Sequence, residues 1–213
     1  MNLPTKITFS RIIATVLLIV ALFIMSFIDF KAPTLGSTGI NLVFLLVFVF
    51  FVIASFTDYL DGHLARKNNQ VTNLGKFLDP VADKLLINSM VIFLIAPWMF
   101  ARYATEQIIS FNMWCVIILV VRDIVVDALR FIAAQKKVVI AANIFGKMKT
   151  VFEMVAISFV LLNGFPFNYF DKGWPTGLHI TDFIVYITTA MSLISGIIYV
   201  VQNRKVFLEE KSE

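Results

Sequence analysis

The chain has 213 residues, of which 59% are hydrophobic and only 15% are charged, and its formal net charge is +4. Soluble domains carry about 25% charged residues, so the composition excludes an ordinary soluble domain and favours a polytopic helical membrane protein. One cysteine and two histidines, far apart in the sequence, exclude an intrachain disulfide and give no support to a zinc site. At this length we expect a single domain, residues 1–213.

Six apolar stretches are long enough to cross a bilayer, which takes about 20 mostly apolar residues in a helix. In chain order they are roughly Ile7–Ile28, Ile40–Thr57, a third that follows Asp79 and runs to about Phe100, Ile108–Ala134, Phe145–Leu162 and Ile180–Val201. The second is expected to continue as a helix through Asp58 and Asp61. Turn-forming or polar residues predict loops at Asp29–Gly39, Ala101–Gln107 and Asn163–His179. We therefore expect an all-α membrane protein with six transmembrane helices.

The basic residues are divided unevenly between the two sides that these spans define. One side has only Lys31, Arg102 and Lys172, whereas the other fifteen of the 18 lie on the side of both termini. Cytoplasmic loops carry the excess of Lys and Arg, so both termini are predicted to be cytoplasmic, and the carboxylates near residues 58–83 with them. Nothing in the sequence indicates nucleic-acid binding.

Four carboxylates at short spacings stand at the ends of two apolar stretches, at Asp58, Asp61, Asp79 and Asp83. Spacings of three and four place each pair on one face of a helix. The linker between the pairs allows the two helices to run antiparallel, so that the four carboxylates converge. Such a cluster repels itself unless cations lie between its members. Mg²⁺ or Mn²⁺ ions suit oxygen ligands, and two of them can clamp both oxygens of a phosphoryl displacement.

Small residues and one arginine accompany the aspartates. Gly62, Ala65 and Gly75 leave room for a bulky ligand, and the planar guanidinium of Arg66 matches phosphate oxygens. Pro80, directly after Asp79, predicts an early helical turn at this point. Helix-end capping would explain one pair of aspartates but not this whole pattern.

The stretch resembles the signature D-x2-D-G-x2-A-R-x8-G-x3-D-x3-D of the CDP-alcohol phosphatidyltransferase family, with every defining position present. The resemblance covers the whole chain, because the family has a six-helix membrane core, usually in a homodimer. It implies that the four aspartates hold two metal ions and that Asp83 also accepts the acceptor's proton. It further implies that the CDP moiety is surrounded by Gly62, Ala65, Arg66 and Gly75.

The N-terminal segment from Asn2 to Arg11 resembles the N-P-(x)n-T-x2-R opening of the bacterial phosphatidylglycerophosphate synthases within this family. This resemblance implies a further set of residues that contact CDP-diacylglycerol, namely Asn2, Pro4, Thr5, Thr8 and Thr72. Arg11 lies one turn inside the first apolar stretch, where it either snorkels to the interface or reaches a ligand phosphate.

A second cluster of cations bears on the acceptor. Arg122 and Arg130 are eight residues apart and share a helix face, and Lys147 and Lys149 begin the fifth span. Together with Arg11, these residues suit an acceptor that carries a phosphate. The basic flanks of a membrane span do not explain Arg122, which follows the apolar run Cys-Val-Ile-Ile-Leu-Val-Val. The segments Arg122–Arg130 and Gly146–Thr150 resemble later motifs of the same synthases. In those motifs, smaller residues are commoner at the positions of Asp127 and Ala128.

The resemblances imply transfer of a phosphatidyl group from CDP-diacylglycerol to sn-glycerol 3-phosphate, giving phosphatidylglycerophosphate and CMP at a bacterial cell membrane. Other acceptors remain open, namely myo-inositol phosphate, serine and phosphatidylglycerol. Intramembrane carboxylates also mark ion paths, so an ion transporter is a different class of interpretation. Transporter sites tend to lie at the bilayer midplane between internal repeats, whereas here the aspartates gather at one face and no repeat is visible.

Overall fold

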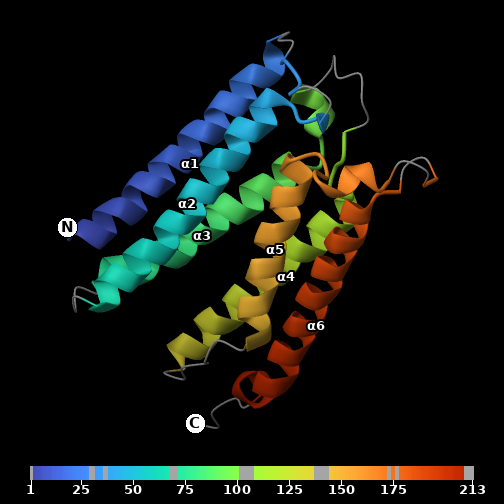
Figure 1. The fold of residues 1–213 in the computed structure, drawn as a ribbon. Coiled ribbons are helices and arrows are strands. Elements are labelled where there is room, and N and C mark those ends of the chain that lie inside the picture. The colour runs from blue at the N-terminus through green and yellow to red at the C-terminus, as the bar shows by residue number, and fades with distance from the viewer. Residues whose placement is uncertain are drawn as a thin grey trace.

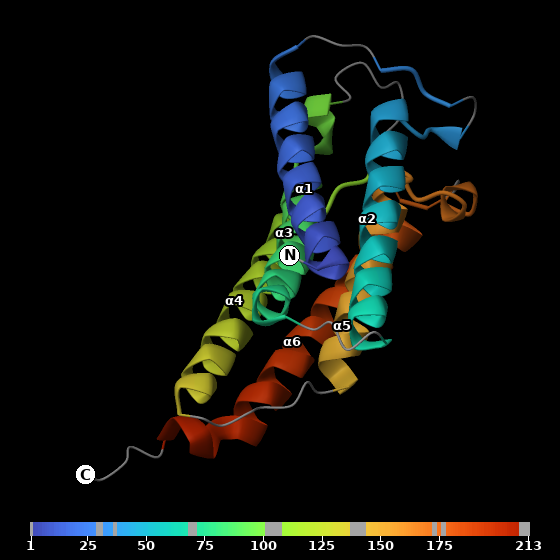
Figure 2. The ribbon, with the colours of Figure 1, turned by 90° about the vertical axis from the view of Figure 1, so that its left-hand side faces the viewer.

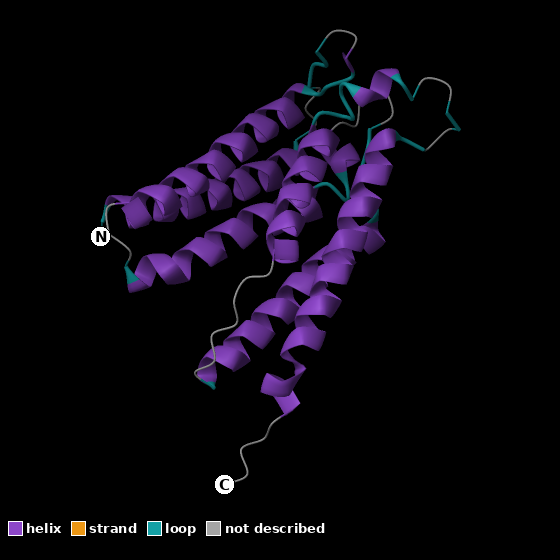
Figure 3. Cartoon of the chain, turned by 60° about the horizontal axis from the view of Figure 1, so that its bottom comes forward, coloured by secondary structure: helices purple, strands orange, loops and turns teal. Residues whose placement is uncertain are grey.

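The computed structural model describes residues 2–28, 32–35, 38–67, 72–100, 108–136, 144–171, 174–175 and 178–208. Within these ranges the chain is helical and contains no strand (Figure 3). The α-helices are α1 (Leu3–Phe27), α2 (Leu42–Lys67), α3 (Asn73–Phe93), α4 (Met113–Gln135), α5 (Ile144–Leu161) and α6 (Ile180–Leu208). Two short 3-10 helices, η2 (Pro97–Phe100) and η3 (Phe167–Tyr169), lie in the connections. The prediction of an all-α protein is confirmed.

The helix starts differ from the predictions at two places where a polar side chain caps the first turn. Thr72 accepts a hydrogen bond from Gly75 N at 3.0 Å, so α3 begins at Asn73 rather than after Asp79. The prediction that Pro80 lies in an early turn is therefore wrong, since Pro80 is inside the helix. Asn112 accepts from Trp114 N at 2.9 Å, and α4 accordingly starts later than Ile108. Side-chain oxygens at this position satisfy otherwise unpaired backbone N–H groups.

The helices form two groups (Figure 1). α1 packs against α3 and α2, whereas α6 packs against α4 and α5. Figure 2 shows, from the side, α1 running along α3 and α4 running along α6. The groups are joined where α5 contacts α2 and α3, and where α3 contacts α4. Away from this junction they diverge, toward the end of the molecule that carries the start of α1 and the ends of α2, α4 and α6 (Figure 1).

The junction between the groups is filled by large apolar side chains from four helices. Fully buried members of this core are Phe44, Phe51, Leu86, Met90, Leu119 and Ile157. The outer faces are apolar as well: Leu17, Phe23 and Phe27 of α1 are 62%, 64% and 76% exposed. Apolar side chains facing outward over a whole helix indicate contact with lipid rather than water.

Among the described residues, three helical segments are long and apolar enough to cross a membrane, namely Leu3–Phe27, Leu42–Gly62 and Ile180–Arg204. α3, α4 and α5 fall outside this set because charged residues interrupt them, such as Asp83, Arg122 and Lys149. The predicted number of six spans is thus not confirmed by length and composition. Asp83, Arg122 and Lys149 also line a cavity between the helices.

Candidate active site

A cavity of about 330 Å³ lies between the two groups of helices, with walls from α2, α3, α4 and α5. Its charged lining has six carboxylates, from Asp58, Asp79, Asp83, Asp123, Asp127 and Glu153. It has four basic side chains, from Lys84, Arg122, Arg130 and Lys149. Carboxylates therefore outnumber cations along a wall that is otherwise surrounded by apolar helices. The tertiary structure brings three of the four predicted metal ligands to one cavity with three of the predicted acceptor-phosphate residues.

The aspartate side of the cavity is completed by α1. The Thr8 hydroxyl lies 3.2 Å from Asp61 Oδ2 and 3.0 Å from Asp79 Oδ1, so it bridges carboxylates of α2 and α3. Buried Arg11 forms an ion pair with Asp58. α1 thus supplies both a hydroxyl and a positive charge to the aspartates, which is why the N-terminal segment and the aspartate motif belong to one site.

The chemistry of these donors fits a divalent metal ion, because hard cations take carboxylate oxygens. One of the donors is also unsatisfied: Asp61 is 2% exposed, and its Oδ1 is buried without a hydrogen-bond partner. Burying an unpaired carboxylate oxygen is costly, so a cation at this point would be stabilising. Among the described residues, however, no three His, Cys, Asp or Glu side chains are arranged as they stand to hold a metal ion. The metal ligands remain a prediction.

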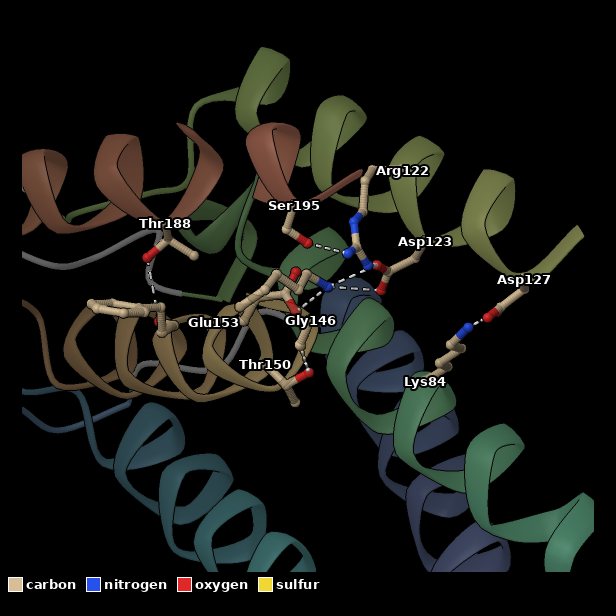
Figure 4. Close-up of polar contacts among 11 residues, drawn as sticks. Lys84, Arg122, Asp123, Asp127, Gly146, Thr150, Glu153, Thr188 and Ser195 are labelled. Carbon is tan, nitrogen blue, oxygen red and sulfur yellow. Dashed lines mark hydrogen bonds and ion pairs between the residues drawn. The ribbon is translucent and has the colours of Figure 1, made fainter. Parts of the chain in front are cut away.

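The opposite side of the cavity is a buried ionic network that links α4, α5 and α6 (Figure 4). Lys149 Nζ lies 2.8 Å from each carboxylate oxygen of Asp123 and 2.5 Å from Glu153 Oε2. The Lys149 side chain is only 3% exposed, so its charge depends on these two partners. Arg122 Nη1 lies 3.1 Å from Asp123 Oδ1, and Arg122 Nη2 donates to Ser195 Oγ of α6.

Close packing of α6 against α4 also shapes the path of Arg122. A Cβ atom at Gly196 would lie 2.9 Å from Arg122 Cγ, which is closer than real Cβ contacts. Gly196 therefore leaves the space through which the arginine side chain passes to Asp123 and Ser195. Sequence reasoning missed Gly196 and Ser195, and no motif around them indicates this role.

The remaining predicted residues occupy different surroundings. Arg130 lines the cavity, with its guanidinium carbon 5.5 Å from the centroid of the Tyr199 ring, whereas Lys147 is exposed and does not line it. Pro4 and Thr5 are buried, and Thr5 Oγ1 lies 3.0 Å from Thr72 Oγ1 beside Gly75. Asn2 precedes α1 and Gly62 is half-buried in α2. The side chains of Ala65 and Arg66 lie outside the described residues.

Four charged residues of the cavity were not assigned from the sequence, namely Lys84, Asp123, Asp127 and Glu153. Lys84 follows Asp83 on α3 and forms an ion pair with Asp127 of α4 (Figure 4). Asp127 was noted only as a departure from the usual small residue, and Lys84 carried no signal beyond its place next to an aspartate of the motif. Asp123 and Glu153 are the other two missed carboxylates, although residues four apart on a helix, such as Lys149 and Glu153, are placed to pair.

The sequence of the chain is similar to a known protein family and to several named proteins. The sequence profile of the CDP-alcohol phosphatidyltransferase family matches residues 1–200. The chain is 34% identical over 202 residues to a Bacillus subtilis protein named CDP-diacylglycerol–glycerol-3-phosphate 3-phosphatidyltransferase, with 95% of each chain covered. A Mycoplasma pneumoniae protein of the same name is 37% identical to the chain, over 96% of this chain and 88% of its own length. An Arabidopsis thaliana protein named CDP-diacylglycerol–glycerol-3-phosphate 3-phosphatidyltransferase 2 is 30% identical, over 98% of this chain and 82% of its own length.

Proposed function

The chain belongs to the CDP-alcohol phosphatidyltransferase family, and on this premise we propose that it transfers the phosphatidyl group from CDP-diacylglycerol to sn-glycerol 3-phosphate, giving phosphatidylglycerophosphate and CMP. The names of relatives that match nearly the whole chain support this donor and this acceptor. The observation that carries the proposal is the cavity in which three of the four aspartates of the family signature, Asp58, Asp79 and Asp83, lie together with a cluster of cations.

In the proposed reaction, Asp83 accepts the proton from the 1-hydroxyl of sn-glycerol 3-phosphate. That oxygen forms a bond to the phosphorus of the phosphatidyl group, and the bond from this phosphorus to the CMP oxygen breaks. CMP leaves with the bonding electron pair. Asp83 lines the cavity on α3, and the cations Arg122 and Arg130 line its α4 wall, where they would hold the acceptor's phosphate. A phosphate that is fixed there orients the hydroxyl of the same molecule toward the carboxylate.

Asp58, Asp61, Asp79 and Asp83 would hold two Mg²⁺ or Mn²⁺ ions. When bound, these ions would neutralise the pyrophosphate of the donor and the negative charge that develops on departing CMP. The unpaired Asp61 Oδ1 and the excess of carboxylates along the cavity support this part of the proposal. Thr8 would keep Asp61 and Asp79 together, and Arg11 would hold Asp58 until the donor's phosphates arrive.

The protein is a membrane protein, and we extend the proposal to six spans in a bacterial cell membrane with both termini and the cavity at the cytoplasmic face. Support comes from the alternation of the helices, since α1, α3 and α5 begin at the end of the molecule where α2, α4 and α6 finish (Figure 1). The excess of Lys and Arg on that side supports the orientation. The usual assembly of the family adds a homodimer, which chemical cross-linking in intact membranes would test.

The experiment that tests the function is an acceptor panel. Purified protein with Mg²⁺ and CDP-diacylglycerol is supplied in turn with sn-glycerol 3-phosphate, myo-inositol phosphate, serine and phosphatidylglycerol, and CMP release is followed. We expect release with sn-glycerol 3-phosphate well above the others, together with a lipid product that carries the acceptor's phosphate. Preferential release with a different acceptor would replace the proposed one, and no release with any would refute the transferase.

A further inference from the structure

The four basic side chains of the cavity differ in how firmly they are held. Lys149 is buried between two carboxylates, and Arg122 is bound to both Asp123 and Ser195. Lys84 is different, because it pairs with Asp127 across the space between α3 and α4 (Figure 4). The two side chains of this pair are 30% and 42% exposed, far more than those of the network around Lys149.

Burial decides which lysine can change its partner. Moving Lys149 to a ligand would take the ion-pair partner from the buried Glu153 carboxylate and leave buried Asp123 with Arg122 alone, and breaking a buried ion pair in this way is strongly unfavourable. Partly exposed ion pairs contribute little, because solvent screens both charges. Lys84 can therefore leave Asp127 at small cost, and Asp127 can then be hydrated where it stands.

The position of Lys84 suits a phosphate close to the reacting group. It is the next residue after Asp83 on α3, and both side chains line the cavity. Lys84 also lies within electrostatic range of Arg130 and Lys149, so a phosphate at its ammonium group is attracted by more than one cation. In sn-glycerol 3-phosphate the phosphate and the 1-hydroxyl are at opposite ends of three carbons. A phosphate held by Lys84 therefore keeps the hydroxyl in the neighbourhood of the Asp83 carboxylate.

We propose that Lys84 binds the phosphate of the acceptor, and that Asp127 is a positioning residue that holds Lys84 over the cavity and is exchanged for this phosphate. Asp127 then competes with the acceptor, so affinity for the acceptor is a balance between the two anions. Lys84 can take this role only if the acceptor carries a phosphate, and the assignment thus rests on the proposed function. Lys149, in contrast, holds the network in place and keeps its two carboxylate partners throughout.

The test is a double-mutant cycle on Lys84 and Asp127. The KM for sn-glycerol 3-phosphate is measured at saturating CDP-diacylglycerol for the wild type, Lys84→Met, Asp127→Asn and the double variant, and equilibrium binding of radiolabelled sn-glycerol 3-phosphate is measured in parallel. Lys84→Met should raise the KM and the Kd by about 10- to 100-fold, the usual effect of losing a charge-assisted hydrogen bond. The KM for CDP-diacylglycerol should not change. Lys84→Arg should restore most of the affinity.

Asp127→Asn gives the sharper result, because it should lower the KM about 2- to 5-fold, and misfolding cannot produce a gain in affinity. This gain should disappear when Lys84→Met is also present. A wild-type KM in Lys84→Met would overturn the assignment of Lys84. An equal gain from Asp127→Asn in both backgrounds would show that Asp127 acts by its own charge and not through Lys84, which would overturn the pair.

The wild-type acceptor panel separates these outcomes from a failure of the proposed function. If the wild type uses sn-glycerol 3-phosphate while Lys84→Met is unaffected, only the role of Lys84 falls. If the wild type prefers another phosphate-bearing acceptor, the named acceptor is wrong, and the same cycle with that acceptor decides on Lys84. A wild type that uses only an acceptor without a phosphate overturns both.

Discussion

The two sides of the cavity are built in opposite ways. On the side of α1, α2 and α3, four aspartates are close together in the sequence. Arg11 pairs with Asp58 and the Thr8 hydroxyl lies beside Asp61 and Asp79, while Asp61 Oδ1 is left unpaired. On the side of α4, α5 and α6, Lys149 and Arg122 already have carboxylate partners within the same network. The aspartate side is thus suited to receive cations from solution, whereas the other side is a preassembled scaffold. Three substitutions and one addition of metal test this difference between the two sides of the cavity.

The largest effect is expected on the aspartate side. Asp83→Asn removes the proposed base and should lower the rate of CMP release by about 10²–10⁴-fold, the usual contribution of a general base. Binding of CDP-diacylglycerol should persist. Asp182→Asn, the same chemical change in the first turn of α6 away from the cavity, is the control and should stay near the wild-type rate. An equal rate in both variants would remove Asp83 from the chemistry.

The next largest effect concerns the preassembled side. Lys149→Met should lower the free energy of unfolding by about 3–5 kcal/mol, because it leaves the buried Glu153 carboxylate without its ion-pair partner and Asp123 with Arg122 alone. Lys147→Met, two residues earlier but exposed, should change it by about 0.5 kcal/mol or less. Denaturant unfolding in detergent measures both. Similar losses in the two variants would mean that Lys149 is not the centre of a structural network.

Addition of metal should distinguish the two sides without any reference to activity. At about 100 times its Kd, Mg²⁺ should stabilise the folded protein by about 2.7 kcal/mol, seen as a rise in Tm. Asp61→Asn should remove most of this rise because it removes a predicted ligand, whereas Asp182→Asn should retain it. A rise of equal size in Asp61→Asn would place the binding of Mg²⁺ elsewhere.

The smallest effect tests the contact between α4 and α6. Gly196→Ala should cost about 1–3 kcal/mol of stability through overpacking against Arg122, and should raise the KM for sn-glycerol 3-phosphate by displacing that side chain. A Cβ at Gly146 of α5 meets no atom within 4 Å, so Gly146→Ala should leave stability unchanged or raise it by up to about 1 kcal/mol. If both substitutions behave alike in thermal unfolding, Gly196 does not provide clearance for Arg122.

The helices themselves could be predicted because their signal is local. Apolar stretches of membrane length predicted all six α-helices, and the largest errors in helix starts were at α3 and α4. Capping by Thr72 makes α3 begin earlier than predicted, and capping by Asn112 makes α4 begin later. Pro80 was misplaced for the same reason: a proline signals a restricted backbone but does not say whether a helix has already begun. A contiguous motif such as the one from Asp58 to Asp83 could be recognised, since its defining residues lie on two consecutive helices, α2 and α3.

The partners of the charged residues could not be predicted in the same way. Arg122 was singled out because it interrupts an apolar run, but its contact with Ser195 joins positions 73 residues apart. Lys84 and Asp127 each looked like an ordinary charge beside a motif, and only the approach of α3 to α4 makes them a pair. Lys147 and Lys149 looked equivalent in sequence, although one is exposed and the other buried.

The sequence by itself determined the helical membrane class, the family and the positions of the four aspartates, because each depends on composition or on spacing within one or two helices. Only the tertiary structure decided which charges meet across the cavity, which lysine is fixed and which is exchangeable, and why residue 196 is a glycine. These depend on how closely separate helices approach one another, and burial at those approaches sets the cost of leaving a charge unpaired.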